Sequence, residues 1–404
     1  MGKLKATGRL WMAAMLAVAT LSGQAAGAVV AAPAAARPEP LTLSIAEAMA
    51  LAVRNNVQAR LARAGTIGAK GRVLLAASAL LPQIMGSVFQ NRVYKVNLDA
   101  QGFNLIKFPG ASLPAGLGPF DVFDARVQMT QSLFDLSAWN RTWQSEADRR
   151  AFELDLKLAE DNVAAAAAIA YVEVLRAARD LDAARADLDL ADNFLTLARD
   201  KFQAGTAASI DVTRAENQRA QNKMRLIDAE VASNESGLRL KHVLGIPIAT
   251  PVTLEDSLDF KPASLPAVST AVATGLGHRL EIRIARERVL ADERGVRVAQ
   301  FERLPTIFAH GDYGLSGNTP TSNTFPTGSA GVDLSMPLFV SGRIAGQVLV
   351  AKQSLEEEKS KLDDILLQVE QDVRSSWDES RAAVERVTAA AKDRRGTIVT
   401  RRGP

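Results

Sequence analysis

The stretch from Ser137 to Ala204 contains neither glycine nor proline. These two residue types most often interrupt helices, so their absence over such a length predicts one continuous helix. At ~1.5 Å of rise per residue, this helix is roughly 100 Å long. Typical globular helices are far shorter, which indicates an elongated, mainly helical protein.

The C-terminal half of this helix carries a heptad of large residues beside a heptad of alanines. This pattern predicts close, left-handed packing of helices. A secondary seam of Ala183, Leu190 and Leu197 indicates a second neighbour, as in a ring of helices; an ordinary two-helix coiled coil is the alternative. The primary seam comprises Val174, Ala177, Leu181, Ala184, Leu188, Ala191, Leu195, Ala198 and Phe202.

The long helix is followed by a turn at 205–211 and a return helix at 211–244. Gly205 permits a sharp reversal because it has no Cβ. Asp211 is expected to cap the return helix by accepting its free N–H groups. The candidate residues of this hairpin tip are Lys201, Gly205, Asp211 and Val212.

The segment before the long helix begins with Ser44 and Glu47, spaced as a capping box, and predicts a helix to about residue 80. Leu81 and Pro82 end that helix. Strands are predicted at 83–98 and 121–135, joined by a loop rich in glycine and proline. Apolar and polar residues alternate along the second strand. Its apolar face carries Phe123, Ala125, Val127, Met129 and Leu133.

The same order of elements then recurs. One constant shift along the sequence places Arg60 on Arg283, and Leu81-Pro82 on Leu304-Pro305. Leu81, Pro82, Leu304 and Pro305 are therefore the candidate corners from helix to strand. The predicted organisation is a first repeat at 44–247, a connector at 248–266 and a second repeat at 267–404, with a helix at 267–303, strands at 305–316 and 329–340, and a long helix at 342–392.

The second repeat is shorter than the first. The part from Phe339 to Pro404 covers little more than half the length of the corresponding part from Phe134 to Pro247. Residues 394–404, RRGTIVTRRGP, also lose the helical pattern. We expect this chain to lack the final tip and return helix, as a truncation or a frameshift would cause.

The N-terminal residues 1–28 resemble a secretory signal, with a basic start, an apolar stretch and an Ala26-Gly27-Ala28 cleavage site. Residues 29–43 are expected to be flexible. Cleavage would remove three basic residues and no acidic ones, and would change the net charge from +3 to 0. Nothing in this balance favours nucleic acid as a partner.

The chain has no cysteine, so no disulfide stabilises it. No apolar stretch after residue 28 is long enough to cross a membrane as a helix, so any crossing is expected to use strands.

Motifs for catalysis or cofactor binding are lacking in the sequence. The three histidines, His242, His278 and His310, are far apart, and there is no HExxH, G-x-S-x-G or phosphate-binding loop. We expect no enzyme activity, metal or cofactor. Trp139 and Trp143 follow the second strand one helical turn apart and are candidate membrane-interface aromatics, although packing at the strand–helix junction explains them equally well.

Several of these segments resemble the TolC-like outer-membrane efflux protein family. Residues 42–63 look like its opening helix, although Val57 stands where the family usually has proline. Leu81-Pro82 and Leu304-Pro305 look like its corners into the strands. Residues 201–215, KFQAGTAASIDVTRA, are similar to its hairpin tip.

The resemblance implies a fold that is mainly α with transmembrane β. Three subunits would share a 12-stranded β-barrel in outer-membrane lipid, and their antiparallel coiled-coil helices would form a trimeric α-barrel in the periplasm. A periplasmic adaptor and an inner-membrane pump would dock at the tips, making the homotrimer the exit duct of a tripartite efflux or type I secretion system. Four strands alone are too few to enclose a bore, which independently requires oligomerisation.

Two other classes of protein remain as alternatives. The first is a periplasmic coiled-coil adaptor (membrane fusion protein), which also uses a helical hairpin. The paired alternating strands before each long helix disfavour it. The second is a structural or adhesive protein of the cell envelope.

Overall fold

The computed structural model describes residues 41–97, 116–257 and 264–400, with side chains described to residue 390. The predicted signal sequence at residues 1–28, residues 29–40 and most of the expected 99–120 loop lie outside this part. The helices are α2 (Ile45–Asn55), α3 (Val57–Ser78), α4 (Leu136–Gln203), α5 (Ser209–Leu244), α6 (Val268–His278), α7 (Leu280–Phe301) and α8 (Arg343–Thr400). The strands are β1 (Leu41–Leu43), β2 (Gln83–Val93), β3 (Val96–Asn97), β4 (Gly116–Leu117), β5 (Phe120–Phe134), β6 (Val252–Leu254), β7 (Thr306–Gly317) and β8 (Phe325–Ser335).

The opening helix of each repeat is interrupted, where the sequence predicted one continuous helix. The capping box of Ser44 and Glu47 does begin α2. Asn56 then takes an extended conformation, and its side chain accepts a 2.8 Å hydrogen bond from the N–H of Gln58, so it caps α3. Capping by the side chain competes with continuation of the helix. Arg279 interrupts the second repeat at the corresponding position, so that α6 and α7 repeat the bounds of α2 and α3 under the same shift.

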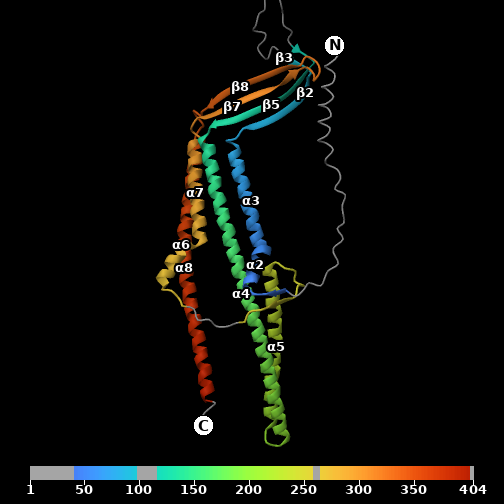
Figure 1. Cartoon of the computed structure of the whole chain (residues 1–404), viewed down its shortest axis with the longest axis vertical. Coiled ribbons are helices and arrows are strands. Elements are labelled where there is room, and N and C mark those ends of the chain that lie inside the picture. The colour runs from blue at the N-terminus through green and yellow to red at the C-terminus, as the bar shows by residue number, and fades with distance from the viewer. Residues whose placement is uncertain (1–40, 98–115, 258–263, 401–404) are drawn as a thin grey trace, which may run out of the picture. The chain divides into compact units, whose positions relative to one another are not determined.

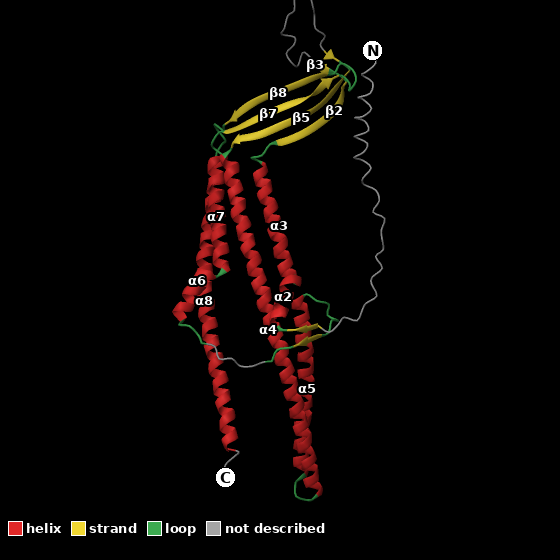
Figure 2. Cartoon of the chain, viewed as in Figure 1, coloured by secondary structure: helices red, strands yellow, loops and turns green. Residues whose placement is uncertain are grey.

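The four long strands form one antiparallel sheet in the order β2-β5-β7-β8 (Figures 1 and 2). The central pair, β5 and β7, joins the two repeats. The last strand spans Phe325–Ser335 rather than the expected 329–340. Pro337 lies just beyond it and has no N–H to donate to a ladder, which explains the early end.

The helices beside the sheet are adjacent in the same order as the strands. Helix α4 packs against α3 on one side and α7 on the other, and α7 packs against α8 (Figure 1). The C-terminal half of α4 forms an antiparallel hairpin with α5. Helix α8 continues to Thr400, past the expected end at 392, because the single Gly396 costs a helix only about 1 kcal/mol.

Strands β1 and β6 pair in a small two-stranded sheet, and each of them corrects a prediction made from the sequence. Leu41–Leu43, expected to be flexible, is a strand, and Val252–Leu254 adds a strand to the expected connector. Pairing between segments so distant in the sequence leaves no local signal in either one. This pairing shows why neither strand was predicted.

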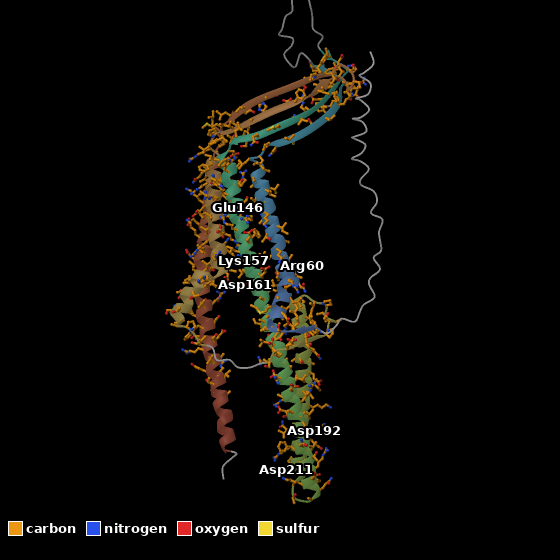
Figure 3. All side chains as sticks on the ribbon, viewed as in Figure 1. Arg60, Glu146, Lys157, Asp161, Asp192 and Asp211 are labelled. Carbon is orange, nitrogen blue, oxygen red and sulfur yellow. The ribbon has the colours of Figure 1, made fainter. Side chains whose placement is uncertain are left out.

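The core lies along α4, where alanines allow neighbouring helices to approach closely. Ala147 and Ala167 are fully buried, and Tyr171 is the largest fully buried side chain. Charged residues such as Arg60, Lys157 and Asp161 stay exposed along α3 and α4 (Figure 3). Between these two helices, Arg63 forms a 2.8 Å ion pair with Glu160.

Candidate functional site

The four-stranded sheet has two chemically different faces. The alternating pattern places Val127 and Met129 of β5 beside Tyr313 of β7 and Ile84 of β2. These four side chains are 43–69% exposed, so this face is apolar and uncovered within the described chain. An exposed apolar face of neighbouring side chains, unlike single scattered apolar residues, indicates contact with lipid or with another apolar surface.

The opposite face of the sheet carries an ion-pair network across three strands. Arg126 of β5 donates from Nε to Asp124 at 2.6 Å, and from a terminal nitrogen to Asp312 of β7 at 2.9 Å. Ser329 of β8 donates to Asp312. Asp124 is only 4% exposed, and a buried carboxylate is tolerated because Arg126 pairs with it. The network therefore links β5, β7 and β8 on a polar face.

The corners from helix to strand have the same structure in both repeats. Leu81 and Pro82 lie between α3 and β2, and Leu304 and Pro305 lie between α7 and β7. Proline has no N–H to continue the helical ladder, so the chain leaves the helix here. In the first repeat, Gln131 of β5 donates a 2.7 Å hydrogen bond to the carbonyl oxygen of Leu80 and fixes the corner to the sheet.

The two seams of α4 differ in exposure. In the primary seam, Ala191 and Leu195 are buried against the α5 hairpin, and the remaining members are partly buried except Phe202, which is 48% exposed. In the secondary seam, Ala183, Leu190 and Leu197 are all exposed. The intrachain hairpin thus satisfies one seam and leaves the other without a neighbour in the described chain.

The hairpin tip reverses at Gly205, whose φ is +72°. The prediction that Asp211 caps the return helix is wrong. The return helix begins at Ser209, its N-cap is Ala208, and no side chain caps it. Asp211 lies in the first turn instead, where its charge favours the helix N-terminus, and it contacts Arg214 at 3.6 Å. Asp192 and Asp211 mark this end of the hairpin in Figure 3, Lys201 lies in the last turn of α4, and Val212 is partly buried.

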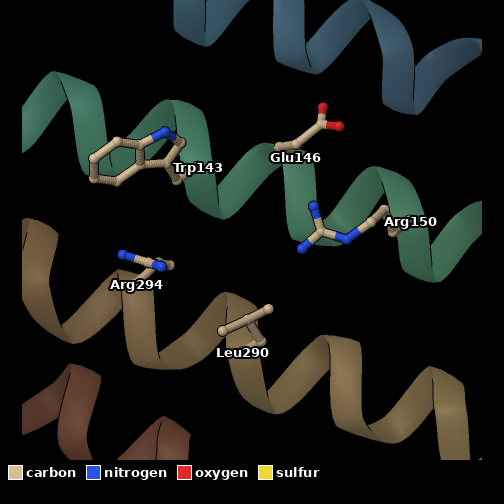
Figure 4. A pocket seen from close by; sticks show the side chains of 5 residues that line it. All are labelled: Trp143, Glu146, Arg150, Leu290 and Arg294. Carbon is tan, nitrogen blue, oxygen red and sulfur yellow. The ribbon is translucent and has the colours of Figure 1, made fainter.

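The two tryptophans after β5 stack edge to face, with ring centroids 6.2 Å apart. Both are about half exposed. The guanidinium of Arg294 on α7 lies 5.2 Å from the centre of the Trp143 ring, within the range of a cation–π contact. A cleft of about 180 Å³ is lined by Trp143, Glu146, Arg150, Leu290 and Arg294 (Figure 4).

Sequence reasoning did not identify several of these residues. Arg126 and Asp124 alternate onto one strand face, which could have signalled a pair. The contacts of Arg126 with Asp312 and of Arg294 with Trp143 join residues that lie in different repeats, and no local pattern reports them.

The part of the chain that the structure describes contains no group of three or more His, Asp or Glu side chains placed to hold a metal ion. Among those same residues, no helix is both long enough and apolar enough to cross a membrane.

Comparison with known proteins places these features in a family. Residues 48–246 match the family model "Outer membrane efflux protein". The chain is 25% identical to the outer membrane efflux protein BepC of Brucella suis over 391 residues, 93% of this chain and 75% of that protein. It is also 25% identical to the outer membrane protein TolC of Escherichia coli over 284 residues, 66% of this chain. This match spans only 56% of TolC, and the match to the efflux pump protein SepC of Pseudomonas putida spans 51% of that relative.

Solved structures agree on the fold. The outer membrane protein VceC of Vibrio cholerae superimposes with a TM-score of 0.70 at 17% identity, covering 86% of this chain and 81% of that one. The Campylobacter jejuni outer membrane channel CmeC also gives a TM-score of 0.70, at 18% identity over 87% of this chain. The predicted mainly helical fold with an antiparallel sheet and the outer-membrane localisation are confirmed, and the relatives are named as outer-membrane efflux proteins rather than adaptors. Residues 48–246 of the chain belong to the outer membrane efflux protein family.

Proposed function

We propose that this chain is one of three identical subunits of an outer-membrane exit duct through which cargo passes without chemical change. The observation that carries the proposal is the sheet. Its edge strands β2 and β8 have no further partner among the described residues, and one of its faces is apolar and exposed. Unpaired edges of this length invite pairing with another chain.

Three copies would close the sheet. Four strands per chain give twelve in the trimer, with β2 of one subunit paired to β8 of the next. A closed barrel leaves no edge, so every backbone N–H and C=O within lipid finds a partner. The Arg126 network would then line the polar interior, and Val127 and Met129 would face lipid.

The helices support the same assembly. Besides Leu190 and Leu197 on α4, the hairpin exposes a heptad-spaced stripe on α5: Met224, Ile227, Val231 and Leu238, each 46–66% exposed. In a ring of helices every hairpin has a neighbour on each side, and these two stripes are the surfaces such neighbours would cover.

The partners proposed are a periplasmic adaptor and an inner-membrane pump, docking at the tip formed by Lys201, Gly205, Asp211 and Val212. The exposed first turn of α5 makes the tip accessible. Relatives are named for toluene efflux, pyoverdine export and alkaline protease secretion, so efflux and type I secretion both stay within the proposal. The chain needs no enzyme activity for this role.

Conductance and oligomeric state test the proposal. Full-length protein reconstituted in planar bilayers should give discrete single-channel steps and should migrate as a detergent-resistant trimer. Leu190→Lys with Leu197→Lys places two charges in the secondary seam and should abolish both signals. Asp189→Lys, a lysine at the adjacent exposed position, should preserve them. Trimers and steps that persist in the double variant would contradict the role given to this seam, and wild-type protein without steps would contradict the duct.

A further inference from the structure

The junction between sheet and helices has a pronounced excess of arginine. It comprises the end of α3, the start of α4, the end of α7 and the start of α8, at residues 72–82, 135–143, 294–305 and 343–350. These segments contain no lysine and only two acids. Of these, Asp135 caps α4 and Glu302 pairs with Arg343 at 2.9 Å. The arginines are Arg72, Arg141, Arg294, Arg297, Arg303 and Arg343.

Within this junction, Arg294 is held at an aromatic cleft without a counter-ion. Both oxygens of Glu146 accept hydrogen bonds from Arg149, at 2.5 and 2.9 Å, and Arg150 pairs with Glu287 at 2.9 Å. Among the described side chains, none of the carboxylates pairs with Arg294, which contacts the Trp143 ring instead. Arg297 lies one turn further along α7 and is exposed, also without an ion pair in the described chain.

The distance of the cleft from the ends of the strands indicates its depth relative to the membrane. Trp139 and Trp143 follow closely after Phe134, the end of β5, and lie in the first two turns or so of α4. At ~1.5 Å per helical residue this is roughly 5–12 Å below the strand end. The headgroup layer of one leaflet is about 5–8 Å thick. With the apolar strand face in the hydrocarbon, the tryptophans and the arginines beside them lie at headgroup level, where Trp is enriched.

We propose that Trp139, Trp143, Arg294 and Arg297 form a binding site for the phosphate of anionic phospholipids, of the phosphatidylglycerol type, in the periplasmic leaflet. The inference rests on the proposed function because it requires the strands to lie in the membrane. A guanidinium offers paired N–H donors that match phosphate oxygens. The half-exposed indoles supply an apolar wall for the glycerol and upper acyl chain. An acidic segment of a protein partner is the competing occupant, and the adjacent apolar strands disfavour it.

Tryptophan quenching tests this site directly. The chain has four tryptophans, and Trp11→Phe with Trp377→Phe leaves Trp139 and Trp143 as reporters. Full-length protein in phosphatidylcholine vesicles is titrated with phosphatidylglycerol brominated on the upper acyl chain, and in a parallel series with brominated phosphatidylcholine. Quenching should favour the anionic lipid, on the order of fivefold for each arginine engaged. The preference should shrink between about 0.1 and 1 M salt, as the screening length falls from about 10 to 3 Å.

Two matched variants separate the site from general charge. Arg294→Gln with Arg297→Gln should bring the ratio of the two lipids close to one, and Arg294→Lys should retain part of the preference. Arg179→Gln with Arg225→Gln removes two exposed arginines from the hairpin and should change nothing. Equal quenching by both lipids in the parent protein, or an unchanged ratio in the first variant, would overturn the inference.

The remaining outcomes also discriminate. If the variant Arg294→Gln with Arg297→Gln loses binding to a protein partner but keeps its preference for the anionic lipid, the arginines bind that partner. This result would overturn the lipid site. Absence of quenching by either brominated lipid would show that the tryptophans are remote from the bilayer, which defeats the proposed membrane placement itself. Strong quenching that is equal for the two brominated lipids would overturn the anionic-lipid site and leave the membrane placement of the strands intact.

Discussion

The hydroxyl of Tyr171 lies 2.9 Å from the Asp256 carboxylate, and this contact joins segments that are 85 residues apart. The same hydroxyl lies 2.9 Å from the Leu43 carbonyl oxygen, and Asp256 also accepts a 2.8 Å hydrogen bond from the N–H of Ile45. One phenol therefore ties the middle of α4 to the start of α2 and to the segment after β6. Burial raises the pKa of Tyr171, so the hydroxyl remains a donor throughout the neutral range.

Tyr171→Phe should lower the free energy of unfolding by about 1–2 kcal/mol, because the single O–H is lost and either the buried Leu43 carbonyl or the Asp256 carboxylate is then left without this donor. Chemical denaturation followed by circular dichroism measures the loss. Tyr313→Phe is the matched control, since Tyr313 is 69% exposed and should tolerate the change. Equal stability of the two variants would show that the hydroxyl contributes nothing.

Alanine should have opposite effects at two glycines of the hairpin. Gly205→Ala forces a Cβ into a conformation with φ of +72° and should destabilise the protein by about 1–2 kcal/mol. Gly237→Ala lies within α5, where the new methyl group meets nothing within 4 Å beyond its own stretch of helix, and it should stabilise the protein by about 0.5–1 kcal/mol. Thermal unfolding of both variants provides the comparison, and shifts of the same sign would contradict this account of the tip.

Asp148 on α4 should make stability depend on pH. Its pKa is raised above the ordinary 3.8 by burial and then by Asp292, against the opposing effects of Arg72 and Arg288. The folded state therefore binds this proton more tightly than the unfolded state. The resulting cost is absent below pH 3.8, appears as the pH rises toward the native pKa and is fully present above it.

Asp148→Asn should accordingly raise the melting temperature at pH 7 and lose that advantage below pH 3.8. Melting curves at pH 7 and pH 3.5 measure both effects. Asp189→Asn, at an exposed position on the same helix, should show little difference at either pH. A melting temperature at pH 7 no higher than that of the parent protein would contradict the role of burial.

The two seams of α4 should respond differently to truncation of leucine. Leu195→Ala opens a cavity at a side chain that is 6% exposed and should cost about 2–5 kcal/mol of unfolding free energy. Leu190→Ala, at 52% exposure, should change the unfolding of a single subunit by less than about 0.5 kcal/mol but should weaken the trimer. Denaturation and analytical ultracentrifugation separate the two effects. A large loss of subunit stability in Leu190→Ala would place that residue in the intrachain core.

The sequence by itself determined the elements whose signal is local and periodic. The long helix without glycine or proline, the alternation through Val127 and Met129, and the corners at Pro82 and Pro305 all follow from backbone sterics and from spacing along the chain. The internal repeat predicted the order of elements. Asn56 shows that even a local signal can be missed. It is a strong helix-capping residue, but it lies within an apolar helical pattern, and that longer pattern predicted an uninterrupted helix.

Tertiary structure alone decided which distant side chains meet. Arg126 pairs with Asp312 because β5 and β7 are adjacent in a particular register, and a shift of one strand by one residue would place the two side chains on opposite faces of the sheet. Arg294 reaches Trp143, and Tyr171 reaches Asp256, through helix packing that fixes their relative positions. Such contacts depend on the geometry of the whole fold, and periodicity along the sequence carries no information about it.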